Sequence, residues 1–299
     1  MWTHPQPQPQ QNPATPAVRD PQARPDAGPQ GPASAGDQGR APSMEQILGG
    51  AVLEPNMSGP AASEMQKILT RLGFSTPVSG THDGPSVAAL RAFQKAYGVA
   101  QNGRLGPTTL QTLRRAQSCS VTLAQLMACA DLPAAEAATE LPGLNAGMYF
   151  ASIDTVQRKA MFIAQLGHES MGFTKFEEMA SGADYEGRSD LGNTQRGDGK
   201  RYKGRGAIQL TGRANYRSAT SDLSAQLGGT DLEKNPERAD DPDVRYLTAA
   251  WFWNERDLNE YADQGQLSTV TRRINGGTNG SADRKQRYNK ALRVLQAPG

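Results

Sequence analysis

The sequence lacks several features that mark common classes of protein. It has two cysteines among 299 residues, and Cys119 and Cys129 do not form the paired CxxC spacing of zinc or redox motifs. Two cysteines cannot build a disulfide framework, so we expect free thiols. No apolar run reaches the ~18 residues of a spanning helix, and residues 1–57 contain no signal-peptide core. We therefore expect no stable membrane insertion and no secretory leader.

Hydrophobic residues are scarce as well, at 36% of the chain, which is low for a chain that is folded throughout. Residues 1–57 contain 11 of the 20 prolines and a single aromatic side chain, Trp2. Such a stretch has too little apolar surface to offset the entropy lost on ordering. We expect a disordered leader over residues 1–57 and two folded domains, over residues 58–118 and 119–299.

The segment 58–118 contains signals for three short helices. Four apolar residues at helical spacing end at Gly73, and two later starts carry a proline in the first turn, Pro85 and Pro107. Residues 58–117 hold 7 basic and 2 acidic side chains. The strings LTRLGF, DGPSVAALRAFQKAYGV and NGRLGPTTLQTLRR resemble the three-helix peptidoglycan-binding domain of many cell-wall hydrolases. The resemblance implies a module that holds an enzyme on an acidic wall polymer.

Residues 155–170 predict a helix with a carboxylate at the end of an apolar stripe. Phe162, Leu166 and Glu169 lie at i, i+4 and i+7. Partial burial at that position disfavours the charged carboxylate, as a general acid requires. Spacing alone fits a solvent-facing glutamate as well, and the surrounding motifs decide between the two.

Glycoside hydrolysis needs a second carboxyl group, which activates water or attacks the sugar. Glu178 lies nine residues after Glu169. On one unbroken helix the two would face opposite sides, ~13 Å apart along the axis. Gly172 offers a break at which the chain can turn and bring the second carboxylate across a cleft. Glu177 and Glu186 compete with Glu178 for this role.

Several motifs in series resemble glycoside hydrolase family 19, the chitinase and phage-lysin type. They include GHESMGF, YEGRSDLGN, GDGKRYKGRGAIQLTGRANY, VTRRINGGTNG and DRKQRY. The resemblance implies a mainly α-helical, lysozyme-like catalytic domain that works by inversion and needs no cofactor. It makes Glu169 the acid, Glu178 the base and Thr211 a residue that helps to hold the attacking water. Further positions match the residues that line the sugar cleft: His168, Tyr185, Arg188, Lys203, Gln209, Asn215, Asn275 and Arg284.

Two departures from the plant members bear on the substrate. Plant chitinases place the second carboxylate much further along the chain and carry several disulfides, whereas here the interval is nine residues. The shortened form is similar to phage and bacterial lysins that act on peptidoglycan. We therefore expect bacterial peptidoglycan as the substrate, cleaved as by a muramidase, with chitin as the rival.

Other chemistries fit the sequence less well. His168 and Glu169 do not complete an HExxH motif, because Gly172 stands where the second histidine is needed, so we expect no metal. GDGKRYKGRG lacks the spacing of a phosphate loop and is interpreted as a sugar-site loop. Helical spacing predicts that Trp251 lies in the core, while Trp253 fits either the core or sugar stacking.

The sequence thus predicts a modular peptidoglycan hydrolase that is a monomer and binds no nucleic acid. We expect it to be made in the bacterial cytoplasm and to reach the wall after release by a holin, as a phage endolysin does. A delivered antibacterial effector or a virion-associated lysin would have the same chemistry. The rival from another class is a wall-binding protein with a degenerate hydrolase domain, which the presence of both carboxylates and Thr211 disfavours.

Overall fold

The computed structural model describes residues 39–297, which divide into two compact units between Ser118 and Cys119. Residues 1–38 of the expected leader lie outside the described residues. Within the described range the regular elements are helices, joined by loops with isolated β-bridges. In that range no helix has both the length and the apolar character needed to cross a membrane. The mainly α-helical fold expected from the sequence is confirmed.

The first unit, residues 39–118, contains the three expected helices and a short one before them, and we call it the wall-binding module after the resemblance described above. Its helices are α1 (Met44–Leu48), α2 (Pro60–Leu72), α3 (Gly84–Ala96) and α4 (Pro107–Ser118). The C-cap of α2 is Gly73, whose φ of 105° lies in the left-handed region that favours glycine. The carboxylate of Asp83 accepts a hydrogen bond from the N–H of Ser86 at the start of α3.

Residues 39–57, expected to belong to the leader, form part of this module instead. Helix α1 packs on α4, and the side chains of Ile47 and Leu53 are fully buried. The backbone of Leu53 also pairs with that of Leu105, with N···O distances of 3.1 and 3.2 Å. The boundary expected at residue 57 was wrong, because a five-residue helix and one bridge leave no periodic apolar pattern in a proline-rich stretch.

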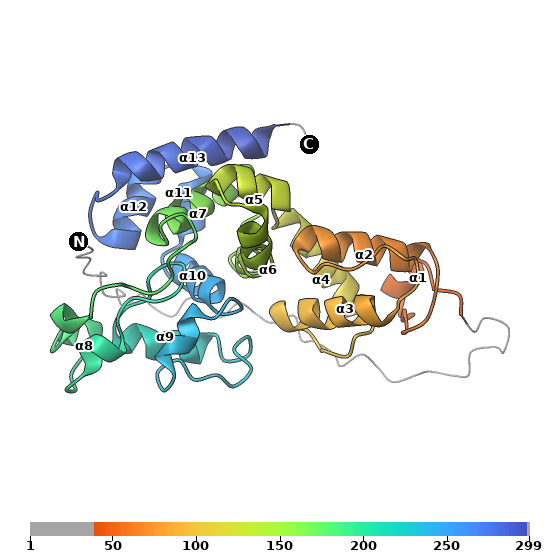
Figure 1. Ribbon diagram of the computed structural model, residues 1–299, viewed down its shortest axis with the longest axis horizontal. Helices are drawn as coiled ribbons and strands as arrows, with labels where there is room; N and C mark the ends of the chain where they lie inside the picture. The colour runs from red at the N-terminus through yellow and green to blue at the C-terminus, as the bar shows by residue number, and fades with distance from the viewer. Residues whose placement is uncertain (1–38, 298–299) are drawn as a thin grey trace. The chain divides into compact units, whose positions relative to one another are not determined.

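The second unit, residues 119–297, has one continuous apolar core, and we call it the catalytic unit after the same kind of resemblance. Its elements are α5 (Leu123–Ala130), α6 (Ala134–Phe150), α7 (Val156–Glu169), η1 (Ala183–Tyr185), η2 (Ser189–Leu191), α8 (Asp198–Arg201), α9 (Arg213–Asp222), η3 (Pro236–Asp240), α10 (Arg245–Asn254), α11 (Leu258–Asp263), α12 (Leu267–Asn275) and α13 (Ser281–Gln296). Helix α13 packs along α7 and α5, and α10 packs on α6 (Figure 1).

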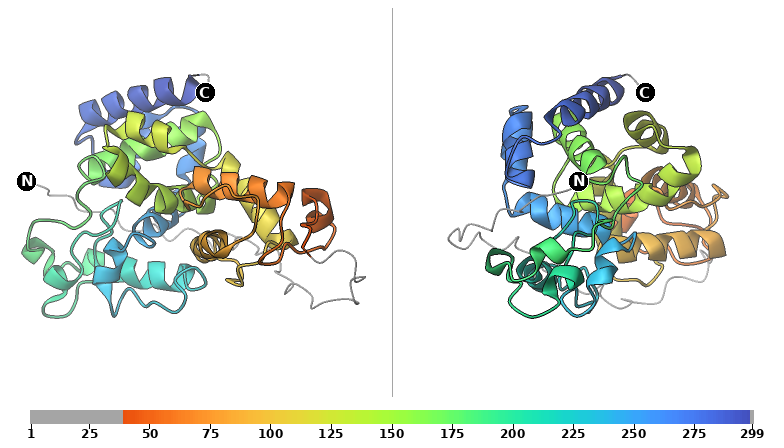
Figure 2. Two further views of the ribbon diagram at one scale, coloured as in Figure 1. Left: turned by 45° about the vertical axis from the view of Figure 1, so that its right-hand side comes forward. Right: turned by 60° about the vertical axis from the view of Figure 1, so that its left-hand side comes forward.

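Two halves of this unit differ in their structure, and we refer to them below as the helical half (α5–α7 and α11–α13) and the loop half (residues 170–241). In the loop half, short helices interrupt long irregular segments. Helix α10 packs against elements of both halves, and α8 and α9 lie on the opposite side of it from α13 (Figures 1 and 2).

The core of the catalytic unit accounts for the tryptophans and the cysteines. Trp251 is 7% exposed and Trp253 is 1% exposed, so both belong to the core, and the side chain of Trp253 donates a hydrogen bond to Asn259 rather than facing a sugar. Cys119 and Cys129 are buried thiols that form no disulfide, as expected. Burial raises the pKa of Cys129 to about 12, which keeps the thiol protonated and unreactive at neutral pH.

Candidate active site

Glu169 is the last residue of α7, and the helix buries it as the sequence predicts. The hydroxyl of Thr155 caps the helix by accepting a hydrogen bond from the N–H of Arg158. Phe162 and Leu166 are fully buried, and Glu169 itself is 4% exposed. The carboxylate therefore ends an apolar stripe inside the protein.

Arg284, the fourth residue of α13, fixes this carboxylate from the side. Its Nη2 donates to Oε1 of Glu169 at 2.5 Å, and its Nη1 donates to the side-chain oxygen of Gln165. The guanidinium is completely buried, and Gln165 in turn donates to Thr271 of α12 at 3.2 Å. Glu169 is thus buried and is paired with a buried guanidinium.

His168 lies behind this pair rather than in the pocket. Its Nδ1 is hydrogen-bonded to Asp283 at 2.7 Å, and Asp283 also accepts a bond from Arg287. Its ring packs so closely on Gly280 that a Cβ there would come within 2.1 Å of it. Burial and the nearby charge of Arg284 lower the pKa of His168, which favours a neutral ring.

The chain turns immediately after α7 and brings Glu178 back toward Glu169. Gly172 has a φ of 77°, in the left-handed region, so the break expected there is present. The N–H of Glu178 donates to the carbonyl of Gly204 at 2.9 Å. Its carboxylate accepts hydrogen bonds from the hydroxyl of Tyr185 and the N–H of Gly204, both at 3.1 Å. Within the described residues no cation lies within ion-pair distance of it, and it is 9% exposed.

Both carboxylates line one pocket that is open to solvent. Its lining consists of Glu169, Met171, Lys175, Glu177, Glu178, Met179 and Gln209. Gln209 has a φ of 57°, uncommon for a residue other than glycine, and its amide nitrogen donates to the carbonyl of Gly206 at 3.1 Å. The hydroxyl of Thr211 donates to the carbonyl of Gln209 at 2.8 Å. A Cβ built on Gly204 would lie 3.3 Å from both Oε2 of Glu178 and Oγ1 of Thr211, so these atoms converge there.

The two carboxylates that compete with Glu178 have other partners. Glu177 is paired with Lys203 at 3.2 Å and with Arg205 at 3.1 Å, and its side chain is 46% exposed. Glu186 accepts hydrogen bonds from the N–H groups of Gly197 and Gly199, which lower its pKa. Glu186 does not line the pocket.

The remaining residues expected in the sugar cleft occupy different places. The amide of Asn215 donates to the carbonyl of Thr211 at 2.7 Å and so supports the backbone of that residue. Lys203 donates to the backbone carbonyl of Glu178 at 2.9 Å. Asn275 bonds within the loop before α13, and Arg188 pairs with Asp190; neither residue lines the pocket.

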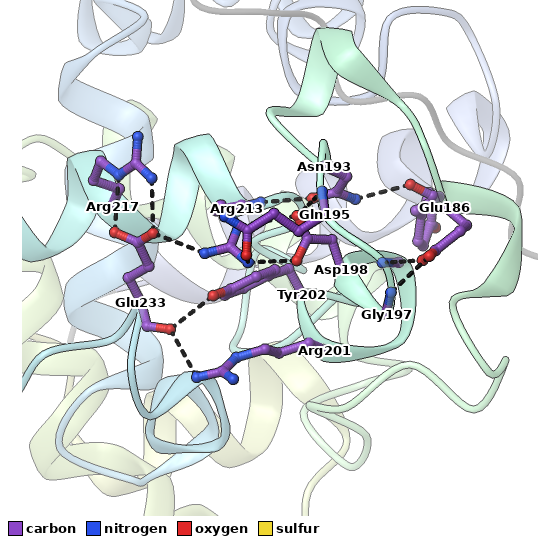
Figure 3. A network of polar contacts seen from close by, with 12 residues as sticks. Glu186, Asn193, Gln195, Gly197, Asp198, Arg201, Tyr202, Arg213, Arg217 and Glu233 are labelled. Atoms are coloured by element: carbon purple, nitrogen blue, oxygen red, sulfur yellow. Dashed lines mark hydrogen bonds and ion pairs between the residues drawn. The ribbon is translucent and has the colours of Figure 1, made fainter.

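A polar network holds the segment that carries Tyr185 (Figure 3). Arg213 donates to both carboxylate oxygens of Asp198, at 2.5 and 2.9 Å, and these bonds lower the pKa of Asp198. The side chain of Asn193 donates to the carbonyl of Tyr185 and accepts from the N–H of Arg213, both at 2.9 Å. On the far side, Glu233 accepts bonds from Arg213 and Arg217.

Sequence reasoning missed three groups that shape the site. Gln165 lies four residues before Glu169 on the same face of α7, so helical spacing was a usable signal for it. Asp283 and Asp198 had no such signal, because their partners lie far away along the chain.

In the part of the chain that the structure describes, no three histidine, cysteine, aspartate or glutamate side chains gather to hold a metal ion.

Two family models match the chain. The model of the peptidoglycan binding domain matches residues 58–113, and the model described as chitinase class I matches residues 134–286. A glycosyl hydrolase family 19 domain-containing protein of Haemophilus influenzae is 33% identical over 168 residues, which cover 46% of this chain and 79% of that protein. An endochitinase of Arabidopsis thaliana is 40% identical over 119 residues, which cover 40% of this chain and 39% of the plant protein.

Among solved structures, chitinase C of Streptomyces griseus aligns with 60% of this chain and 95% of its own. The sequence identity is 23% and the TM-score is 0.47.

Proposed function

The chain belongs to the class I chitinase family, glycoside hydrolase family 19, and on that premise we propose that it is a peptidoglycan hydrolase of the muramidase type. One observation carries the proposal: a peptidoglycan-binding domain lies in the same chain as a pocket lined by two carboxylates. A module that binds the wall raises the local concentration of glycan around the pocket.

In this proposal Glu169 donates the proton to the leaving glycosidic oxygen. Its Oε1 is held by Arg284, while Oε2 accepts no hydrogen bond from the described residues and is available to the substrate. The buried guanidinium keeps the carboxyl group in one orientation, so its proton meets a substrate oxygen at a defined place.

Glu178 is the proposed base that activates water for attack on the opposite face of the sugar. It is favoured over Glu177 because the carboxylate of Glu177 already forms ion pairs with Lys203 and Arg205. A water molecule between Oε2 of Glu178 and Oγ1 of Thr211 has an acceptor for its proton on one side and a positioning hydroxyl on the other.

Purified sacculi treated with wild type and with Glu169→Gln test this proposal directly. We expect wild type alone to release fragments, and mass spectrometry to find N-acetylmuramic acid at their reducing ends. Reducing-end N-acetylglucosamine would make the enzyme a glucosaminidase instead. If wild type releases no glycan fragment, the proposal fails.

Chitin hydrolysis is the second candidate, and the identity of 40% with a plant endochitinase favours it. Cleavage of chitin oligomers by wild type, with sacculi left intact, would support it. If wild type cleaved neither sacculi nor chitin oligomers, the protein would be a wall-binding protein without hydrolase activity.

We further propose that the wall-binding module anchors the enzyme, and that the protein acts as a phage endolysin after release from the bacterial cytoplasm. Deletion of residues 1–117 should weaken pull-down on sacculi but preserve cleavage of soluble glycan fragments. Equal binding by the shortened protein would remove the anchoring role. Lysis that begins only when a holin is co-expressed would support the endolysin over a delivered effector.

A further inference from the structure

Exposed apolar side chains gather at the catalytic pocket. Within the described residues three large hydrophobic side chains are exposed, and two of them, Met171 at 49% and Met179 at 69%, line this pocket. The third, Val78, belongs to the wall-binding module. Large apolar groups grouped on a surface mark binding sites more often than single exposed residues do.

The backbone before the pocket is bent into an unusual conformation at one of these residues. Met171 has a φ of 51°, in the left-handed region that residues other than glycine rarely adopt. It directly follows the end of α7 and Ser170, whose side chain is fully buried. Unusual backbone of this kind occurs preferentially at functional sites. Here it accompanies a methionine that lines the pocket beside Glu169.

Lys175 supplies a positive charge between the two methionines in sequence and lines the same pocket. Its side chain is exposed, and in the described part of the chain no carboxylate lies within ion-pair distance of it. Two of the three carboxylates of the lining have cationic partners, since Glu169 is paired with Arg284 and Glu177 with Lys203, while Glu178 accepts hydrogen bonds from neutral donors. Lys175 is therefore available to a ligand.

The chemistry of the two candidate glycans differs at one point that matters here. Chitin is a neutral polymer of N-acetylglucosamine. Peptidoglycan carries a lactyl ether on every second sugar, extended by a short peptide with free carboxylates. A cation flanked by apolar side chains is complementary to a carboxylate-bearing peptide arm and has no charged partner on chitin.

We propose that Lys175, flanked by Met171 and Met179, binds the peptide arm of peptidoglycan and makes this edge of the pocket the specificity-determining one. This inference rests on the proposed function, since it names the substrate group that the same pocket recognises. The ammonium pairs with a peptide carboxylate, and the flexible thioether side chains adapt to the methyl and methylene groups beside it.

The test compares full-length wild type with Lys175→Met on two substrates prepared from the same sacculi. One is soluble glycan strands with their peptides attached. The other is the same strands after an amidase has removed the peptides and the lactyl carboxylates left by that cleavage have been converted to neutral methyl amides. We expect Lys175→Met to lower kcat/KM about tenfold on the peptide-bearing strands, mainly through KM, because a charge-assisted contact is lost. On the stripped strands its kcat/KM should match that of wild type.

Three further variants sharpen the result. Lys285→Met removes an exposed lysine of α13 that does not line the pocket, and it should leave both substrates unaffected. Lys175→Arg keeps the charge and should retain the preference for peptide-bearing strands. Met179→Ser should lower kcat/KM about threefold on those strands alone, as expected for the loss of part of an apolar contact.

The outcomes separate this inference from the proposed function. An equal loss of kcat/KM on both substrates would mean that Lys175 acts through the charge of the pocket and not through the peptide. No loss on either substrate would mean that Lys175 has no role in binding. Either result overturns the inference but leaves the proposed hydrolase function intact. If wild type cleaves neither kind of strand, peptidoglycan hydrolysis itself fails, and the inference fails with it.

Discussion

The helical half and the loop half of the catalytic unit each supply one carboxylate to the pocket, but they hold it by different means. Glu169 ends a packed helix and is tied to the buried guanidinium of Arg284. Glu178 lies on irregular backbone and accepts hydrogen bonds from the neutral donors Tyr185 and Gly204. The comparison shows how one pocket gives two carboxyl groups different surroundings, which is how paired carboxylates acquire different roles.

The strongest way to sharpen this comparison is to remove each candidate base from the loop half. Glu178→Gln should lower kcat on sacculi by roughly 10²–10⁴-fold, the usual contribution of a positioned general base. Glu177→Gln is the matched control one residue away and should retain most of the activity, because its partners are Lys203 and Arg205. The reverse pattern would move the base to Glu177.

Removing the guanidinium of Arg284 should destabilise the helical half. Arg284→Met leaves the buried carboxylate of Glu169 without a partner, and we expect the free energy of unfolding to fall by ~3–5 kcal/mol in urea titrations. Adding Glu169→Gln to that variant should restore part of the loss. Arg287→Met is the control, since its pair with the more exposed Asp283 should contribute ~0–1 kcal/mol. Equal effects of the two arginine variants would contradict the difference between buried and exposed pairs.

The hydroxyl of Tyr185, a neutral donor in the loop half, should contribute more to the rate of hydrolysis than to the stability of the fold. Tyr185→Phe removes the hydroxyl that bonds Glu178, and we expect kcat to fall about tenfold with little change in the melting temperature. Burial and the charge of Glu178 raise the pKa of Tyr185, so the hydroxyl remains a donor throughout the neutral range. A rate unchanged within twofold would show that Gly204 alone positions the base.

The smallest expected effect concerns acid stability of the loop half. The bonds from Arg213 lower the pKa of Asp198 in the folded state, so this pair stabilises the protein fully above the unfolded pKa of about 3.8 and loses its effect as pH falls through the folded value. Asp198→Asn should therefore be less stable than wild type at pH 6, and the two should converge as the pH falls from about 3.8 through the lowered folded pKa. Circular dichroism at a series of pH values measures this, and a constant difference down to pH 2 would exclude the ion pair as its cause.

Local signals in the sequence predicted much of the fold. Gly73, Pro85 and Pro107 mark helix ends because capping and backbone preferences act within a few residues. The helix ending at Glu169 also followed from spacing alone. Helix α1 was missed, because its burial depends on α4, which lies far away along the chain.

Local sequence signals predicted only part of the candidate site. Glu169 had a periodic signal, whereas Glu178 was distinguished from Glu177 by a family resemblance alone. The structure separates them through partners, since Glu177 meets two cations and Glu178 meets neutral donors. Such differences depend on loops that fold back over more than 20 residues, and no local pattern encodes them.

The sequence by itself determined helices α2, α3 and α4 of the wall-binding module, the burial of Glu169 and the family of the catalytic unit, since capping, periodicity and ordered motifs are local properties of the chain. Only the tertiary structure decided which groups surround each carboxylate. Arg284 reaches Glu169 across 115 positions, and Gly204 reaches Glu178 across 26. Contacts of that range form only when the packed core and the polar networks bring distant segments together, and the chemistry of the pocket depends on them.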